Sequence, residues 1–251
     1  MINKISDNWY EDFFKGINCE LCEKSYPDEW TQQELDFLLY ELQLQPGQHV
    51  LDIPCGFGRL SIEMAKKGLN VTGIDISKTF IDGLNKEITS GNLSVNAIEA
   101  DMLTVTIPQK FSGAICMGNS FGYFNFDKMK IFVEKVAASL ETGAKFIINS
   151  GMIAESILPN FSEERSFAFD NMRMDIFNIY NADEGYMSSN LLYTMPDKTE
   201  EHSFKHYVFT LAEVKRLLKL YGLNTIATYS SFSKEKYNFG DHQIYLVAEK
   251  E

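Results

Sequence analysis

The sequence lacks any apolar run long enough to cross a membrane, which takes about 20 residues in a helix. It also lacks a cluster of basic residues: 23 Lys and Arg stand against 35 Asp and Glu, for a net charge of −12. A field of this sign repels nucleic-acid phosphates. We therefore expect no membrane and no nucleic acid among the partners of this protein.

Cysteine is scarce as well. The four cysteines include one C-x-x-C pair, Cys19 and Cys22, but no second pair stands at a spacing typical of zinc sites. We interpret the pair as two ordinary thiols on a helix face and predict no metal site. Residues 1–7 lack the hydrophobic core of a signal peptide, which predicts a cytoplasmic protein.

What is present is an ordinary globular composition over 251 residues, with 45% hydrophobic and 23% charged residues. A chain of this length suits one α/β domain with an elaboration. The chain is compatible with a monomer or a homodimer. The partner we expect is a small molecule.

One stretch organises the chain. The apolar run 49–53 has the length of a buried strand, and a helical pattern follows over residues 60–66. Gly56 and Gly58 lie between them, where the absence of a Cβ lets a ligand approach the backbone and the N-terminus of the helix. This pattern predicts a strand, a cofactor-binding turn and a helix.

A second strand is predicted over residues 70–75 and ends on Asp75. In a nucleotide-binding βαβ unit, an acid at this place accepts hydrogen bonds from ribose hydroxyls. The sequences VLDIPCGFGR and VTGIDIS together resemble the motifs of class I S-adenosylmethionine-dependent methyltransferases. Pro54 stands where the commonest form of that motif has its first glycine, and a PCG-x-GR variant occurs among small-molecule methyltransferases.

The resemblance implies S-adenosyl-L-methionine as the cofactor. It implies that Asp101 accepts a hydrogen bond from the adenine amino group and that the backbone of Met102 meets the edge of the ring. The residues expected on the cofactor are Asp52, Pro54, Cys55, Gly56, Gly58, Arg59, Asp75, Ile76, Asp101, Met102, Met117 and Asn119.

The acceptor side is predicted from two segments. Residues 118–124, GNSFGYF, follow an apolar strand, and ligands of open parallel sheets bind beyond the carboxyl ends of the strands. Residues 7–26 are rich in aromatics and are interpreted as a helix that packs on the domain, as a lid, or as both. The residues expected on the acceptor are Tyr10, Tyr26, Trp30, Ser120, Phe121, Tyr123 and His206. Of these, Tyr123, Tyr10, Tyr26 or Trp30 is expected to stabilise a cationic centre, Tyr123 is a predicted catalytic residue, and His206 is a candidate base.

The fold class implied is a Rossmann-like, doubly wound α/β fold. We expect a seven-stranded, mostly parallel sheet with an antiparallel C-terminal strand, and a small antiparallel β insertion. The expected parts are a helical lid (1–45), a cofactor-binding core (46–150), the insertion (151–209) and a C-terminal helix with a strand pair (210–251). Within the insertion, about three strands are predicted over residues 173–180, 186–195 and 201–209.

Helix starts are predicted from capping signals. Thr31 and Glu34 form the pattern of a capping box before a helix over residues 32–42, and Thr210 and Glu213 form a second one. Ser77 is the predicted cap of a helix over residues 78–89. Asp127 is the predicted cap of the next helix.

The function indicated is methyl transfer to a nitrogen or oxygen of a small-molecule acceptor. Two alternatives stay open. Gly56-x-Gly58-x-x-Ser61 nearly matches the dinucleotide fingerprint of NAD(P)-dependent Rossmann oxidoreductases, although Asp52 would bring a negative charge close to a pyrophosphate. A non-catalytic S-adenosylmethionine-binding module is the other, because these motifs indicate binding and not turnover.

Overall fold

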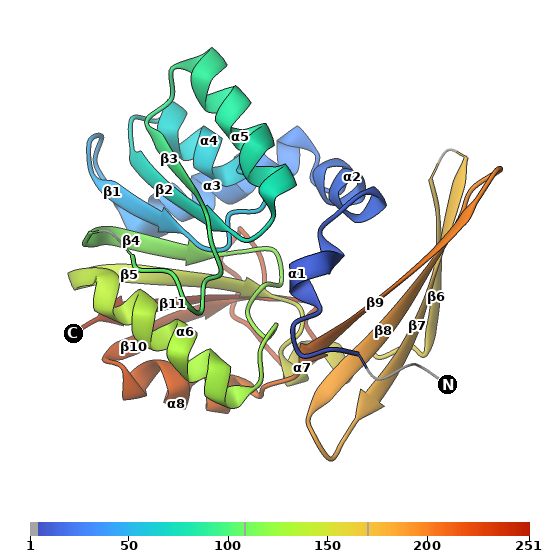
Figure 1. Ribbon diagram of the computed structural model, residues 1–251. Helices are drawn as coiled ribbons and strands as arrows, with labels where there is room; N and C mark the ends of the chain where they lie inside the picture. The colour runs from blue at the N-terminus through green and yellow to red at the C-terminus, as the bar shows by residue number, and fades with distance from the viewer. Residues whose placement is uncertain (1–4, 108, 170) are drawn as a thin grey trace.

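The computed structural model describes residues 5–107, 109–169 and 171–251 (Figure 1). The first part of the N-terminal stretch 1–7 therefore lies outside the described residues. The main element is a seven-stranded sheet with the order β10-β11-β5-β4-β1-β2-β3. Its strands are β1 His49–Asp52, β2 Asn70–Asp75, β3 Val95–Glu99, β4 Phe111–Cys116, β5 Leu140–Ser150, β10 Leu223–Tyr229 and β11 Ile244–Lys250.

Strands β1 to β5 are parallel, and β11 pairs antiparallel with both β5 and β10. This arrangement confirms the predicted fold class. Strand β1 lies between β2 and β4, so the chain runs outward through β2 and β3 and then returns to the other side of β1. Such a switch point leaves a crevice at the carboxyl ends of the two central strands, where ligands of this fold bind.

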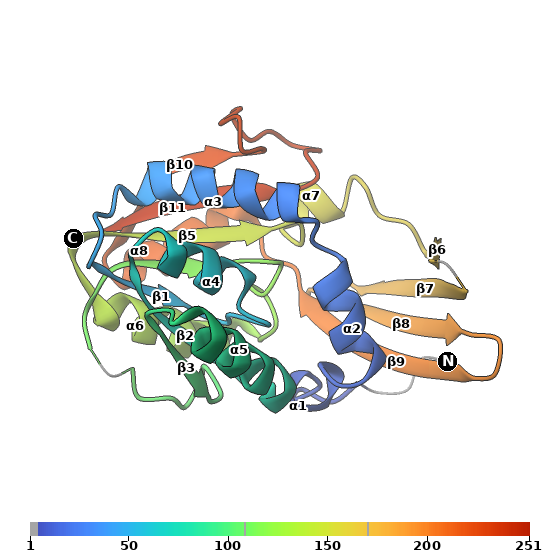
Figure 2. The same cartoon turned by 90° about the horizontal axis from the view of Figure 1, so that it is seen from above.

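Helices cover both faces of the sheet (Figures 1 and 2). Leu51 and Phe132 belong to one buried cluster, whereas Val50 and Leu38 belong to another on the opposite face. Neighbouring residues of β1 thus bury opposite sides, which explains its unbroken apolar run. The helices are α3 Asp28–Leu42, α4 Arg59–Lys66, α5 Lys78–Gly91, α6 Phe126–Ser139 and α8 Leu211–Leu220.

Two of the four predicted helix starts are confirmed. Ser77 Oγ accepts from the Phe80 N–H and caps α5, and Thr210 with Glu213 forms a capping box at α8. The capping box at Thr31 is wrong: α3 begins at Asp28 with Pro27 as its N-cap, because the residue before a proline is disfavoured in the helical region and the helix does not extend further back. Thr31 therefore lies inside the helix.

The start of α6 also differs from the prediction. Asn125, and not Asp127, is the N-cap, and its side chain accepts from the Lys128 N–H at 3.0 Å. Both residue types favour this position, but the extended backbone of Asn125 places its oxygen over the first turn. Asp127 lies in that turn, where its charge complements the helix dipole.

The insertion is a separate four-stranded antiparallel sheet with the order β6-β7-β8-β9. The three predicted strands are confirmed as β7, β8 and β9, and the prediction missed β6. Its strands are β6 Glu164–Phe169, β7 Met172–Asn181, β8 Tyr186–Thr194 and β9 Thr199–Tyr207. A short helix, α7 Ala154–Ile157, lies between β5 and this sheet.

The N-terminal segment folds as two short helices, α1 Tyr10–Phe13 and α2 Ile17–Lys24. They lie between the large sheet and the insertion in both views (Figures 1 and 2). The Trp9 ring contacts Tyr123 of the core and Phe204 of β9, with centroid distances of 5.0 and 5.6 Å. The segment is thus held from both sides. Among the helices described, none has the length and hydropathy needed to cross a membrane.

Candidate functional site

The turn after β1 needs its two glycines for different reasons. Gly56 has φ +55°, and a Cβ built there would meet no atom within 4 Å. Gly58 has φ +82°, and a Cβ there would come within 2.4 Å of the Leu84 side chain. Gly56 therefore leaves space in front of the turn, whereas Gly58 lets α5 pack closely behind it.

Asp75, at the end of β2, fixes that turn. One carboxylate oxygen accepts from the Gly56 N–H and the other from the Ser77 N–H, each at 2.8 Å. Burial raises the pKa of Asp75, and the backbone hydrogen bonds from Ser77, Gly56 and Ile76 oppose that rise. Each carboxylate oxygen has a second lone pair, so the acid retains acceptor capacity for a ligand.

Asp52, at the end of β1, is buried beside the turn. Its carboxylate accepts a hydrogen bond from Ser61 Oγ at 2.7 Å. Burial raises the pKa of Asp52 to about 7, and the Ser61 bond and the Arg59 charge only partly offset this effect. Near neutral pH this group therefore gains or loses a proton when a charge arrives next to it.

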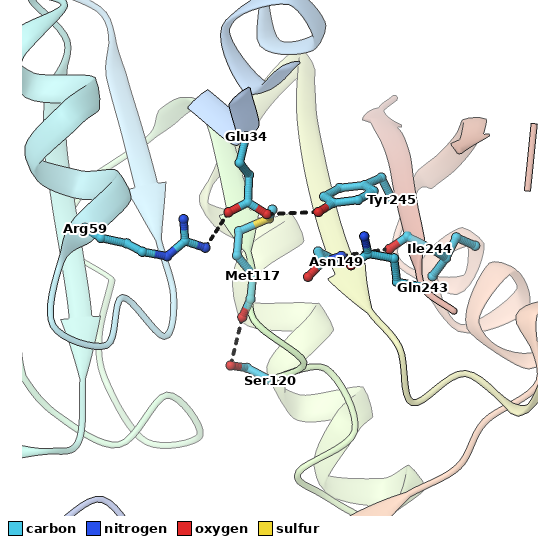
Figure 3. A network of polar contacts seen from close by, with 8 residues as sticks. All are labelled: Glu34, Arg59, Met117, Ser120, Asn149, Gln243, Ile244 and Tyr245. Atoms are coloured by element: carbon cyan, nitrogen blue, oxygen red, sulfur yellow. Dashed lines mark hydrogen bonds and ion pairs between the residues drawn. The ribbon is translucent and has the colours of Figure 1, made fainter. Parts of the chain in front are cut away.

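Arg59, the first residue of α4, is held by two neighbours. It forms an ion pair with the buried Glu34 of α3 (Figure 3). Its guanidinium carbon lies 4.1 Å from the centroid of the Tyr26 ring, close enough for a cation–π contact. A cation is thus kept next to a group of carboxylates.

A cavity of about 920 Å³, part of it open to solvent, lies at the switch point of the sheet. Fourteen of the predicted site residues line it: Tyr10, Tyr26, Asp52, Pro54, Cys55, Gly56, Arg59, Asp75, Ile76, Asp101, Met102, Met117, Ser120 and Tyr123.

Asp101 lies at the wall that follows β3. Its Oδ1 accepts from the Leu103 N–H at 2.8 Å, so the acid orders the loop that it begins. Its charge also contributes to raising the pKa of Tyr10 to about 12, although burial is the larger cause.

Ser120 and Tyr123 lie at the opposite wall, which follows β4. The Ser120 hydroxyl donates to the Met117 carbonyl at 3.0 Å (Figure 3). Burial raises the pKa of Tyr123.

Five other predicted site residues lie outside the cavity lining. Trp30 is 39% exposed and packs against Phe232, with ring centroids 4.9 Å apart. Asn119 accepts from the Gly151 N–H and so joins two loops. Phe121 is buried against Phe132 in the core. The other two are Gly58, behind the turn, and His206.

His206 lies behind Tyr123, with the two ring centroids 5.5 Å apart. Its Nε2 lies 3.1 Å from the Phe121 carbonyl oxygen, so this nitrogen carries the proton and donates. Burial lowers the pKa of His206 to about 4, which keeps the ring neutral. The free lone pair is therefore on Nδ1.

The cavity also contains residues that the sequence analysis did not name individually as site residues: Phe14, Cys22, Phe57, Leu60, Ile74, Phe80, Ala100 and Gly118. Gly118 lies in the predicted acceptor segment 118–124. Phe14 and Cys22 belong to the segment interpreted as a lid, and the resemblance to a motif gave no signal for residues outside the motif. Phe80 lies in α5, which was predicted only as a helix capped by Ser77. Glu34, which contacts Arg59, had been predicted only as part of a capping box.

Residues 50–143 match the family model described as a methyltransferase domain. Over these residues the chain carries a methyltransferase domain. The matched segment begins in β1 and ends within β5, so it contains the glycine turn and the acids that end β1 and β2, Asp52 and Asp75.

Two curated relatives carry methyltransferase names. A ubiquinone biosynthesis O-methyltransferase of Coxiella burnetii is 39% identical over 72 residues, 28% of this chain and 31% of that protein. The cypemycin N-terminal methyltransferase of a Streptomyces species is 24% identical over 210 residues, 82% of this chain and 84% of that protein. The chain spans less than half the length of the first curated relatives it matches, 42% and 31%.

A solved structure supports the fold of nearly the whole chain. The S-adenosylmethionine-dependent methyltransferase from Clostridium acetobutylicum superposes with a TM-score of 0.80 at 17% identity, over 93% of this chain and 96% of that one. The likeness therefore extends well beyond the matched segment 50–143.

The cavity of the methyltransferase domain fits its cofactor in chemical type. S-adenosylmethionine presents ribose hydroxyls, an adenine amino group, an ammonium and a carboxylate. Three acids, Asp52, Asp75 and Asp101, and one guanidinium line the cavity, and the turn at Gly56 has room for close approach. Acceptors and a cation are both present for these groups.

Proposed function

We propose that this chain binds S-adenosyl-L-methionine in the cavity at the switch point and transfers its methyl group to a nitrogen or oxygen of a small-molecule acceptor. The observation that supports this most directly is the Asp75 carboxylate, which spans the Gly56 N–H and the start of α5 at the edge of the cavity. In the matched family of folds, an acid at this strand end binds ribose.

The other cofactor roles follow from charge. Asp52 accepts from the ammonium of the methionine moiety, and Arg59 pairs with its carboxylate. Asp101 accepts from the adenine amino group, while Met102 and Phe80 supply apolar surface to the ring. The remaining cofactor contacts that we propose are Pro54, Cys55, Gly56, Ile76 and Met117, which line the same cavity, with Gly58 and Asn119 supporting the loops around it.

The bound cofactor supplies a methyl group already activated by its positive sulfur. The chain has to hold the acceptor in line and to exclude water; such orientation supplies roughly 7–11 kcal/mol in favourable cases. Tyr10 and Phe14 of the N-terminal segment line the cavity together with Tyr123. Tyr10 is only 4% exposed, so this segment acts as the cover that excludes water.

The ionisation of the cavity favours a neutral amine acceptor. Among the lining residues that the structure describes, none is a histidine or a lysine. Burial holds the pKa of Tyr10 at about 12 and raises that of Tyr123, so both phenols keep their protons. A neutral amine attacks with its own lone pair, and Tyr10, Tyr26 and Tyr123 stabilise the cation that forms. An acceptor hydroxyl would need a base, and the predicted base His206 does not fit that role, because it lies outside the cavity lining and burial lowers its pKa to about 4.

Titration calorimetry with S-adenosylhomocysteine, NADH and NADPH in parallel tests the cofactor assignment. We expect micromolar binding of S-adenosylhomocysteine alone. Binding of only a nicotinamide cofactor would instead indicate an oxidoreductase. A panel of paired amines and alcohols, incubated with S-adenosylmethionine and assayed by mass spectrometry, then tests turnover. Cofactor binding without methylation of any acceptor would favour a non-catalytic binding module.

A further inference from the structure

Arg59 carries an unpaired donor inside the protein. Its side chain is 11% exposed, and Nη1 is buried without a hydrogen-bond partner in the part of the chain that the structure describes. An unsatisfied donor on a charged group costs free energy on burial. The cost is offset when a ligand brings an acceptor to it. Arg59 also lines the cofactor cavity, so the donor is in the right place for a ligand group.

Glu34 fixes the other side of the guanidinium. Its carboxylate is 1% exposed and pairs with Arg59 Nη2 through one oxygen. The other oxygen accepts from the Tyr245 hydroxyl at 3.2 Å. The three residues come from α3, α4 and β11 and converge at one point (Figure 3). Both oxygens of the acid are thus engaged, one on the cation and one on a strand of the sheet.

This pair is not explained by stability. Removing two charges from water costs several kcal/mol for each ion, and apolar side chains of similar volume often stabilise a protein as well or better. Arg59 is the only cation among the described lining residues, whose other charged members are Asp52, Asp75 and Asp101. A free guanidinium in that surrounding would turn toward the acids. Glu34 prevents this because it occupies Nη2 from the side of α3.

We propose that Glu34 is a positioning residue that holds Arg59 for the carboxylate of the cofactor's amino-acid end. The inference rests on the proposed function, since it assumes that S-adenosylmethionine occupies the cavity. Glu34 does not line the cavity and acts through Arg59. A planar guanidinium fixed at one amino group presents the other to a carboxylate in a defined direction. The cavity thereby distinguishes ligands that carry a carboxylate from ligands that lack it.

The test compares two ligands that share the thioadenosine part. S-adenosylhomocysteine carries the amino-acid end, and 5′-methylthioadenosine does not. Glu34→Gln should raise the Kd of S-adenosylhomocysteine by roughly 10- to 100-fold, the equivalent of one charge-assisted hydrogen bond. The Kd of 5′-methylthioadenosine should stay within about twofold. A merely structural role would weaken both ligands together, and that result would overturn the proposal.

Glu41→Gln is the matched control, because Glu41 lies on the same helix and is also buried, at 7% exposure. Its side chain is not part of the hydrogen-bonded set Glu34, Arg59 and Tyr245. The Kd of S-adenosylhomocysteine should therefore not change in this variant. A loss equal to that of Glu34→Gln would mean that the effect belongs to α3 as a whole.

A double-mutant cycle tests that Glu34 acts through Arg59. Arg59→Met should raise the Kd of S-adenosylhomocysteine at least as much as Glu34→Gln does. In the double variant, the Kd should exceed that of Arg59→Met alone by less than about twofold. Full additivity would contradict the proposal. If Glu34→Gln fails to fold, Tyr245→Phe is the second variant, because it removes only the hydroxyl that binds the Glu34 carboxylate. It should raise the Kd of S-adenosylhomocysteine by a smaller factor and leave that of 5′-methylthioadenosine unchanged. Equal weakening of both ligands would overturn the proposal. Failure of the unaltered protein to bind S-adenosylhomocysteine would instead refute the proposed function.

Discussion

The Asp75 carboxylate accepts the Gly56 N–H at 2.8 Å and thereby ties the end of β2 to the turn after β1. The same acid holds the start of α5 through the Ser77 N–H. One side chain thus fixes the two backbone segments that border the cavity. Its loss should change the shape of the site as well as its charge.

We predict that Asp75→Ala weakens S-adenosylhomocysteine by about 10- to 100-fold, because a ligand hydrogen bond to a charged group and the order of the turn are lost together. Titration calorimetry measures this directly. Asp82→Ala is the control, since Asp82 is an exposed residue of α5 that pairs with Lys78. Unchanged affinity in the Asp75 variant would remove this residue from the proposed role.

Asp52 makes a prediction about pH. In the unliganded fold its pKa is about 7, above its ordinary value of 3.8, so the native state binds more protons than the unfolded state between these values. Its contribution to stability is therefore complete below about pH 4 and is lost as the pH rises toward 7. A ligand ammonium favours the charged carboxylate, so binding at pH 6 should release a proton and affinity should rise between pH 6 and 8.

Calorimetry in buffers of different ionisation enthalpy detects the released proton. Asp52→Asn should flatten the rise of affinity with pH, because an amide does not titrate in this range. Absence of proton release at pH 6 in the unaltered protein would show that the ligand ammonium is not next to Asp52.

The two glycines of the turn should respond differently to alanine. Gly58→Ala combines a left-handed backbone with a clash against Leu84, and we expect a loss of about 2–4 kcal/mol in the free energy of unfolding. Gly56→Ala meets no neighbour and should cost about 1–2 kcal/mol, but its methyl group enters the ligand's space and should weaken S-adenosylhomocysteine.

Gly83→Ala completes this comparison, because Gly83 lies in α5 with open space around it and alanine favours a helix by up to about 1 kcal/mol. Urea unfolding of the three variants measures the order of stability. Equal losses at Gly56 and Gly58 would contradict the separate reasons given for the two residues.

The cover over the cavity is joined to the insertion by one buried hydrogen bond. Tyr193 of β8 donates to Asn18 Oδ1 of α2 at 2.8 Å. Tyr193→Phe should accelerate amide hydrogen exchange in α2 and raise the Kd of S-adenosylhomocysteine by roughly 2- to 10-fold, as expected for one hydrogen bond.

Tyr40→Phe is the control for this change, since Tyr40 is 61% exposed on α3, and exchange in α2 should then be unaltered. Exchange in α2 that stays the same in the Tyr193 variant would show that this hydrogen bond does not hold the cover.

Sequence was a good guide where the determinants are local. The strand, turn and helix from His49 to Lys66 are set by periodicity and by glycine, and the capping box at Thr210 lies within four residues. Strand β6 was missed because its six residues are all exposed, so it shows no alternation of apolar and polar residues.

Distant partners explain the errors at the site. Glu34 matched a capping pattern three residues after Thr31, yet its partners are Arg59 and Tyr245. Nothing in the local sequence indicates pairs so far apart along the chain. For the same reason, the inclusion of Phe14 and Cys22 in the cavity depends on how the N-terminal segment folds back.

The position of β11 has a consequence for synthesis. This strand pairs between β5 and β10 and is translated after every other strand of the sheet. Tyr245, which holds Glu34, belongs to it. A nascent chain on the ribosome can therefore fold β1, the glycine turn, Asp52 and Asp75 before Tyr245 is available to hold Glu34, the partner of Arg59. The part of the cavity that we propose for the cofactor carboxylate is finished only when β11 leaves the exit tunnel and pairs with β5.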